Sequence, residues 1–166
     1  FVYVQHRSNA NRSLLIELVQ KRTGMKVVEL PEGRHPIEFN TVYLSQPNSE
    51  LRIVSGELLS IPTSSAQRQS HVIDTFLSSL ADQQGDRSVG IILSGAGSDG
   101  TIGLKAISDR GGLTFAQEPA SAKYESMPQS AASTGVADHV LKPREIAAEL
   151  LKYVSHLRAI TPESVH

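Results

Sequence analysis

The chain has 166 residues, which is enough for one domain with a buried core and too few for two domains of typical size. A net charge of −1 and a charged content of 20% exclude a global field that would recruit nucleic acid or an anionic membrane. The chain has no cysteine, which excludes disulfides, thiolate metal sites and a cysteine nucleophile, and no apolar run approaches the ~20 residues of a membrane span.

The first part of the chain predicts strands, one helix and a small insertion. Residues 1–5 form a short apolar, β-branched run that is typical of a buried strand. A helix is expected over "NRSLLIELVQKRTG", where apolar residues share one face and Gly24 can end it, and "MKVVEL" predicts the next strand. Residues 41–61 contain three short strand candidates separated by turn residues, which predicts an antiparallel β insertion.

The rest of the chain alternates helices with strands. A helix is expected over "SHVIDTFLSSLADQQG", and "VGIIL" predicts a strand that passes through a glycine-rich turn into a helix ending at "DRGG". "LTFAQ" and "DHVL" predict further strands with short helices between them, and Pro143 suits the first turn of a last helix. We therefore expect an α/β domain over residues 1–160, with a mostly parallel sheet covered by helices on both faces, and a frayed tail or linker over 161–166.

The glycine-rich turn has two interpretations. Gly95, Gly97 and Gly100 satisfy G-x-G-x-x-G, and Glu118 ends a later apolar run, which together are typical of a dinucleotide-binding turn with its ribose-binding acid. However, about half of the chain precedes this motif, which usually lies in the first βαβ unit. Asp99 also lies inside the turn, where its charge at the start of the helix would repel a pyrophosphate.

The second interpretation is acid–base chemistry at the ends of two strands. His6 and Asp99 each follow an apolar strand, and ligands of open parallel sheets bind beyond the carboxyl ends of the strands. A carboxylate that accepts from one imidazole nitrogen fixes the tautomer and leaves the other nitrogen free to act as a base. The simpler alternatives are that Asp99 is only an N-cap, that Glu118 is a loop charge and that the other histidines are surface or satisfied groups.

No nucleophile for such a pair is evident in the chain. There is no G-x-S-x-G elbow, which carries the serine in many hydrolases. Ser94 and Ser98 lie in the glycine-rich turn, too close to Asp99 for a relay through His6, and we expect them to be turn residues that bond to the backbone.

The chain resembles the chemotaxis receptor methylesterase family, the CheB family, in several segments that occur in the right order. The segment "VGIILSGAGSDGTIGLKAISDRGGLTFAQEPASAKYESMPQSAASTGVADHVL" is similar to the core of that family, and most similar to versions fused to a receptor methyltransferase. "FVYVQH" resembles the strand that carries the catalytic histidine, and "HVIDTFLSSLA" resembles the helix before the aspartate strand. The resemblance extends from residue 1 to about Leu157.

The resemblance implies a cytoplasmic serine hydrolase that removes the methyl group from glutamate methyl esters on chemoreceptor helices and can deamidate glutamines, with no cofactor and no metal. It implies that His6 is the general base and Asp99 its orienting partner. The backbone amide of Ala96 is then an oxyanion donor, and the smaller side chain of Ala96 changes the shape of the site more than its chemistry. The resemblance places the following residues in the wall around that oxyanion site: Gly95, Ala96, Gly97 and Met127.

The resemblance also indicates what this chain lacks. The family's nucleophile is a serine in an I-G-A-S-type turn, upstream of the histidine strand, and this chain begins after that point. We therefore expect a CheB-type domain without its N-terminal strand and nucleophile turn, whose partners are methylated chemoreceptor helices and fused receiver or methyltransferase domains, with no nucleic acid and no membrane insertion. The alternatives are a non-catalytic module that binds receptors or signalling partners, and a dinucleotide-binding domain.

Overall fold

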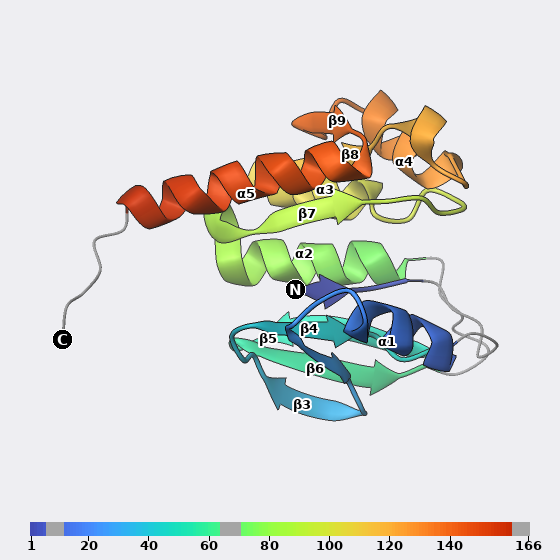
Figure 1. Ribbon diagram of the computed structural model, residues 1–166, viewed down its shortest axis with the longest axis vertical. Helices are drawn as coiled ribbons and strands as arrows, with labels where there is room; N and C mark the ends of the chain where they lie inside the picture. Colours follow the sequence, from blue (N-terminus) through green and yellow to red (C-terminus); the bar gives the residue numbers. More distant parts are fainter. Residues whose placement is uncertain (6–11, 64–70, 161–166) are drawn as a thin grey trace.

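The parallel strands form two half-sheets of three strands each. The computed structural model describes residues 1–5, 12–63 and 71–160. The first half-sheet has the order β1–β4–β2 (Val2–Tyr3, Thr41–Leu44, Lys26–Glu29), and the second has the order β7–β8–β9 (Val89–Ile92, Leu113–Gln117, His139–Leu141). Figure 1 shows helix α2 (Val72–Gln84) between the two half-sheets.

Helices cover both faces of the second half-sheet, as the sequence predicts. Gly90 of β7 faces α3 (Thr101–Asp109), because a Cβ at this position would meet Leu104 and Ile107 at 2.7 Å. Phe115 of β8 points to the other face, where it lines a cavity with Tyr153 of α5 (Pro143–Ile160). The remaining helices are α1 (Arg12–Gln20), α4 (Ser126–Ser133) and the short turns η3 (Gly85–Arg87) and η4 (Pro119–Ser121). The predicted α/β class is confirmed.

A small antiparallel sheet is present, but its strands differ from those predicted. Its order is β3–β6–β5 (Gly33–Pro36, Glu57–Pro62, Ser49–Val54). The predicted insertion over residues 41–61 was wrong about its first strand, because β4 pairs in parallel with both β1 and β2. Three of the four residues of β4 are buried, as is usual for a strand inside a parallel sheet. The third antiparallel strand is β3, whose polar sequence "GRHP" carries no strand signal.

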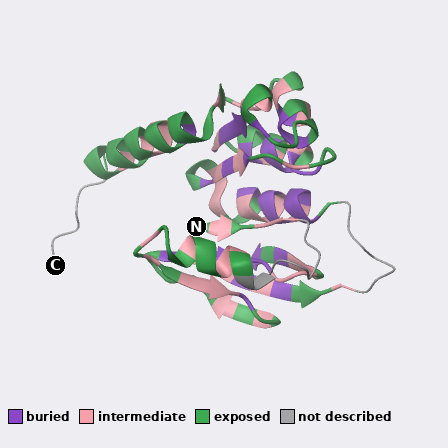
Figure 2. Ribbon diagram, turned by 45° about the vertical axis from the view of Figure 1, so that its right-hand side comes forward, coloured by how far each residue is buried: buried purple, intermediate pink, exposed green. Residues whose placement is uncertain are grey.

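One hydrophobic cluster joins the half-sheets to the antiparallel sheet through α2. Figure 2 shows α2 at the centre of the molecule, with most of its residues buried or partly buried. The cluster includes Ile53 and Leu58 from the antiparallel sheet, Phe76 from α2, Ile92 from β7 and Leu104 from α3. None of the described helices is long and apolar enough to cross a membrane.

A buried hydroxyl without a partner follows the end of β4. Ser45 is 2% exposed, and its Oγ has no hydrogen-bond partner among the described residues. Leaving a buried hydroxyl unsatisfied costs about 1–3 kcal/mol, so we expect Ser45→Ala to raise the free energy of unfolding by about 1 kcal/mol. Denaturant unfolding measures this difference, with Ser88→Ala as the matched control. The Ser88 hydroxyl is equally buried but donates to the Gly85 carbonyl, so its loss should lower stability. A similar loss in both variants would contradict the prediction.

Candidate active site

Asp99 lies in the turn that joins β7 to α3, and it caps a different helix. Its side chain is buried, with 3% of the residue exposed. Oδ2 accepts a hydrogen bond from the amide of Ile73 at 2.9 Å, and Oδ1 accepts one from the amide of Asp74 at 2.8 Å. Both amides belong to the first turn of α2, so the alternative that Asp99 is the N-cap of its own helix was wrong. The Asp99 carboxylate therefore caps the first turn of α2.

The start of α3 is capped in return by Asp74 of α2. Oδ1 of Asp74 accepts hydrogen bonds from the amides of Gly100 at 2.9 Å and Gly103 at 2.8 Å. The two helices therefore exchange buried carboxylates, each capping the other's first turn. Sequence reasoning did not single out Asp74. Its one sequence signal is an acidic residue in the first turn of a helix, a common feature of helix starts that does not identify a site.

The glycines of the turn allow this exchange because they let α2 approach α3 closely. Gly100 has φ of 101°, a conformation that residues with side chains rarely adopt. A Cβ at Gly103 would lie 2.5 Å from Leu77 Cβ and 3.2 Å from Asp74 Cα. Gly100, the last glycine of the G-x-G-x-x-G pattern, is explained by its backbone conformation and by close packing, because a Cβ there would collide with Ile92 Cδ1 of β7 and lie 3.1 Å from Ile73 Cγ2 of α2.

The occupied helix start argues against a dinucleotide. In the dinucleotide-binding turn, the pyrophosphate bonds to the free amides at the start of the helix. Here two of those amides already bond to Asp74, and Asp99 lies beside them. We expect calorimetric titration with NAD or FAD to give no saturable binding at 1 mM, equivalent to about −4 kcal/mol. Micromolar binding would show that the two carboxylates do not block the turn.

Residues 124–127, which lead into the start of α4, hold the glycine turn in place. The amide of Gly95 donates to the Tyr124 carbonyl at 3.0 Å, and the Gly95 carbonyl accepts from the Met127 amide at 3.0 Å. The amide of Gly97 donates to Ser126 Oγ at 3.0 Å. The amides of Gly95 and Gly97 are therefore used inside the protein and are poorly placed to act as oxyanion donors.

The Ala96 amide is a donor that the turn leaves available. The described chain has no cis peptide bonds, so the Ala96 N–H points opposite to the Gly95 carbonyl, which is held by Met127. Ala96 is exposed, and its amide has no hydrogen-bond partner among the described residues. This geometry fits the oxyanion role that the sequence predicts for this amide, a role that stays a prediction.

Met127 supports the turn from the core, and Ser94 supports it from the surface. Met127 belongs to the hydrophobic core, and a Cβ at Gly95 would collide with its Cε and lie 3.0 Å from its Sδ. Ser94 Oγ accepts from the Tyr124 amide at 2.9 Å, and the Ser94 amide donates to Gln117 Oε1 at 2.9 Å. Ser94 is thus a turn residue bonded to the backbone, as predicted.

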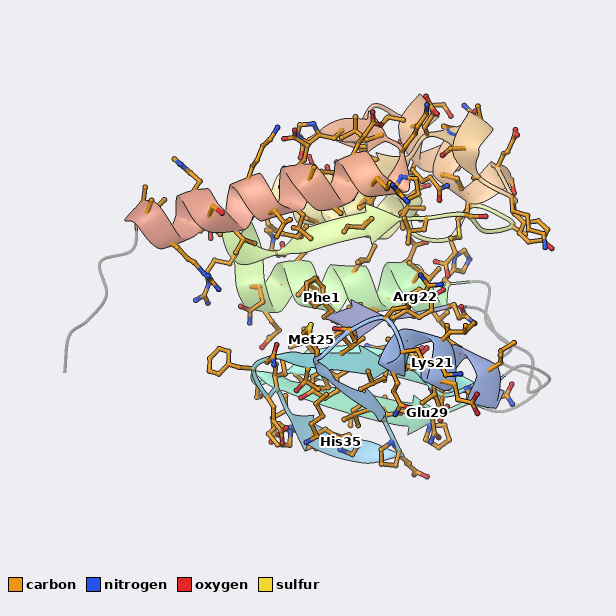
Figure 3. All side chains as sticks on the ribbon, viewed as in Figure 1. Phe1, Lys21, Arg22, Met25, Glu29 and His35 are labelled. Carbon is orange, nitrogen blue, oxygen red and sulfur yellow. The ribbon has the colours of Figure 1, made fainter. Side chains whose placement is uncertain are left out.

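The histidines are divided between the described and the undescribed parts of the chain. His6, the predicted base, lies outside the described residues. Strands β1 and β7 end on the same side of the molecule, where α2 begins (Figure 1). His35 lies on β3, away from α2 (Figure 3), with its Nε2 2.8 Å from the Pro31 carbonyl. His139 stacks on Phe115, so both histidines make contacts that are typical of structural groups.

A third histidine lies next to the exchanged carboxylates. His71 Nδ1 is 3.4 Å from Asp74 Oδ2, and one ligand atom each of His71, Asp74 and Asp99 lies within 4.8 Å of the others. The two carboxylates already accept four backbone amides from two helix starts, whose positive ends disfavour a cation. The cluster therefore fits a buried carboxylate pair better than a metal ion.

These features define an α/β domain whose candidate site lies at the carboxyl ends of parallel strands, around a buried aspartate. A comparison with family models then gives the family. The model described as CheB methylesterase matches residues 1–150, and the chain belongs to this family.

Two curated relatives and one solved structure illustrate the similarity. Protein-glutamate methylesterase FrzG of Myxococcus xanthus is 34% identical over 155 residues, which cover 92% of this chain and 46% of FrzG. A putative protein-glutamate methylesterase/protein-glutamine glutaminase of Leptospira interrogans is 32% identical over 147 residues, which cover 88% of this chain and 76% of that protein. The crystal structure of the Thermotoga maritima CheB methylesterase catalytic domain has a TM-score of 0.79 at 24% identity, covering 92% of this chain and 82% of that one. The chain thus spans less than half the length of FrzG.

Proposed function

We propose that this chain is the catalytic region of a protein-glutamate methylesterase that hydrolyses glutamate methyl esters, and deamidates glutamines, on chemoreceptors. The observation that carries the proposal is the buried Asp99 carboxylate beside the turn in which Ala96 is exposed and its amide has no hydrogen-bond partner among the described residues. An orienting anion and an oxyanion donor at one site are two of the parts that acyl transfer requires. Family membership supports the substrate class, since FrzG and the Leptospira relative carry that activity in their names.

The proposed reaction assigns each group one task. His6 takes the proton of a serine hydroxyl as the serine oxygen attacks the ester carbonyl, and it returns that proton to the leaving methanol. Water then attacks the acyl-serine with the same help from His6, which frees the glutamate side chain. Asp99 holds the imidazole in the correct tautomer, and the Ala96 amide donates to the oxyanion of each intermediate.

The serine is proposed to come from a segment upstream of Phe1. The outer edges of β1 and β7 are not paired by any strand of the described residues, whereas their other edges pair with β4 and β8. Val2 of β1 and Ile92 of β7 pack on the same hydrophobic cluster. A parallel strand between these edges would join the half-sheets and bring the turn that follows it to the carboxyl edge, near Asp99.

The proposed setting is the cytoplasm, with the methylesterase domain over residues 1–160 joined to a receiver or methyltransferase domain. The length of FrzG beyond the matched region supports a larger protein. The test is methanol release from methylated receptor fragments by the complete protein. Methanol release no faster than in buffer without the protein would favour a non-catalytic module that binds receptors or signalling partners.

A further inference from the structure

We propose that Asp74 is a positioning residue of this site, whose negative charge balances the positive helix starts around Asp99. Asp99 then acts on the catalytic histidine with its full charge. This inference rests on the proposed function, because it concerns how Asp99 assists a base.

Two helix N-termini meet at Asp99. The Asp99 carboxylate bonds to the first turn of α2, and α3 begins at Thr101, two residues after Asp99. Each helix start carries a partial positive charge of roughly half a unit, so the two starts together could offset the charge of one carboxylate. Without another anion, Asp99 would present little net negative potential to its surroundings.

Asp74 supplies that other anion at the place where α3 needs it. Its Oδ1 accepts from Gly100 and Gly103, and the residue is 7% exposed. One oxygen of Asp74 lies within 4.8 Å of an oxygen of Asp99. The site thus holds two carboxylates against two helix starts, and burial lets these charges act with little screening by water.

The balance of charges has a consequence for the base. The imidazole gains a proton in each transition state, and negative potential stabilises the imidazolium. Loss of the Asp74 charge should therefore make the histidine a weaker base, lower kcat and move the acid limb of the kcat/KM profile to lower pH. A residue that only caps α3 would affect stability without moving that limb.

Other charged groups near Asp74 are already paired, apart from His71. Arg52 of β5 and Asp82 of α2 line a shallow cavity of about 340 Å³ together with Asp74. Arg52 bonds to Glu50 at 2.6 Å, and Asp82 bonds to Arg110 at 2.6 Å. His71 is the titratable side chain of the described residues that contacts Asp74 from outside, and it provides a second way to test the proposal.

The first test uses Asp74→Asn in the complete protein. Asparagine keeps an oxygen for the amides of Gly100 and Gly103 but removes the charge. We expect kcat to fall about two- to threefold with little change in KM, and the acid limb of kcat/KM to move down by about half a pH unit. A lower melting temperature with unchanged kcat and an unchanged limb would overturn the proposal and leave Asp74 as a structural cap.

The second test changes the electrostatic potential at the site but leaves the two capping carboxylates, Asp74 and Asp99, in place. His71 has a side chain that is 64% exposed, so substitutions there should fold. His71→Lys places a fixed positive charge beside Asp74. The acid limb of its kcat/KM profile should therefore lie at lower pH than that of the matched variant His71→Gln. Acid limbs at the same pH in the two variants would overturn the proposal. If the unmodified complete protein releases no methanol, the proposed function fails and this inference fails with it. If the unmodified protein is active and Asp74→Asn has the same kcat and the same pH profile, this inference alone is refuted.

Discussion

Asp99→Asn in the complete protein is expected to lower kcat for methyl-ester hydrolysis by about 10⁴-fold, the loss that the same change causes in chymotrypsin-type triads. Both oxygens of Asp99 accept backbone amides of α2, at 2.9 and 2.8 Å. An asparagine offers only one acceptor, so its NH₂ group must face a donor or turn toward the imidazole and favour the wrong tautomer. Methanol release from methylated receptor fragments measures the loss.

A surface aspartate provides the control for this substitution. Asp82 of α2 forms an exposed ion pair with Arg110, and its replacement by asparagine should leave kcat within about twofold. The melting temperatures of both variants show whether a loss of activity comes from a loss of stability or from the chemistry of the site. A folded Asp99→Asn protein that keeps more than a tenth of the activity would refute the role of Asp99 as the orienting group.

The order of helices and strands around the site was predictable because its signals are local. The strand β7, the glycine turn and α3 follow from an apolar run, three glycines and a helical repeat that lie within 21 residues, from Val89 to Asp109. The helix α2 likewise follows from its own periodicity. The placement of Asp99 at the carboxyl end of a parallel strand was therefore a sound prediction.

The helix that Asp99 caps could not be read from the sequence. An aspartate before a helix is most simply its N-cap, and only the approach of α2 to α3 allows each aspartate to cap the other helix. That approach depends on Gly103, where a Cβ would meet the α2 backbone at Asp74. Caps that cross between helices are tertiary contacts, which local patterns do not encode.

The assignment of β4 to a sheet was also beyond local reasoning. "TVYLS" is a short apolar run, and such a run fits an antiparallel strand as well as a buried parallel one. Its pairing with β1 and β2 is decided by residues that lie about 40 and 15 positions upstream. β3 is recognisable only through its register with β6.

The 166-residue chain alone is expected to hydrolyse methyl esters at or near background, whereas the complete protein turns over and its His6→Ala variant does not. His6 and Asp99 can take and stabilise a proton, but they cannot form an acyl-enzyme, which needs a nucleophile. The assay is methanol release by the three proteins side by side.

Full activity in the 166-residue chain would mean that a serine within it is the nucleophile. Ser94 is poorly suited, because its hydroxyl accepts from the Tyr124 amide at 2.9 Å and supports the turn. Ser98 is exposed in the same turn, next to Asp99, so Ser98→Ala in the isolated chain is the variant that would identify it. Equal activity in the chain with and without Ser98 would exclude that role. Background activity in the chain together with turnover in the complete protein assigns the nucleophile to a segment outside residues 1–166, as the unpaired edges of β1 and β7 in the described structure suggest.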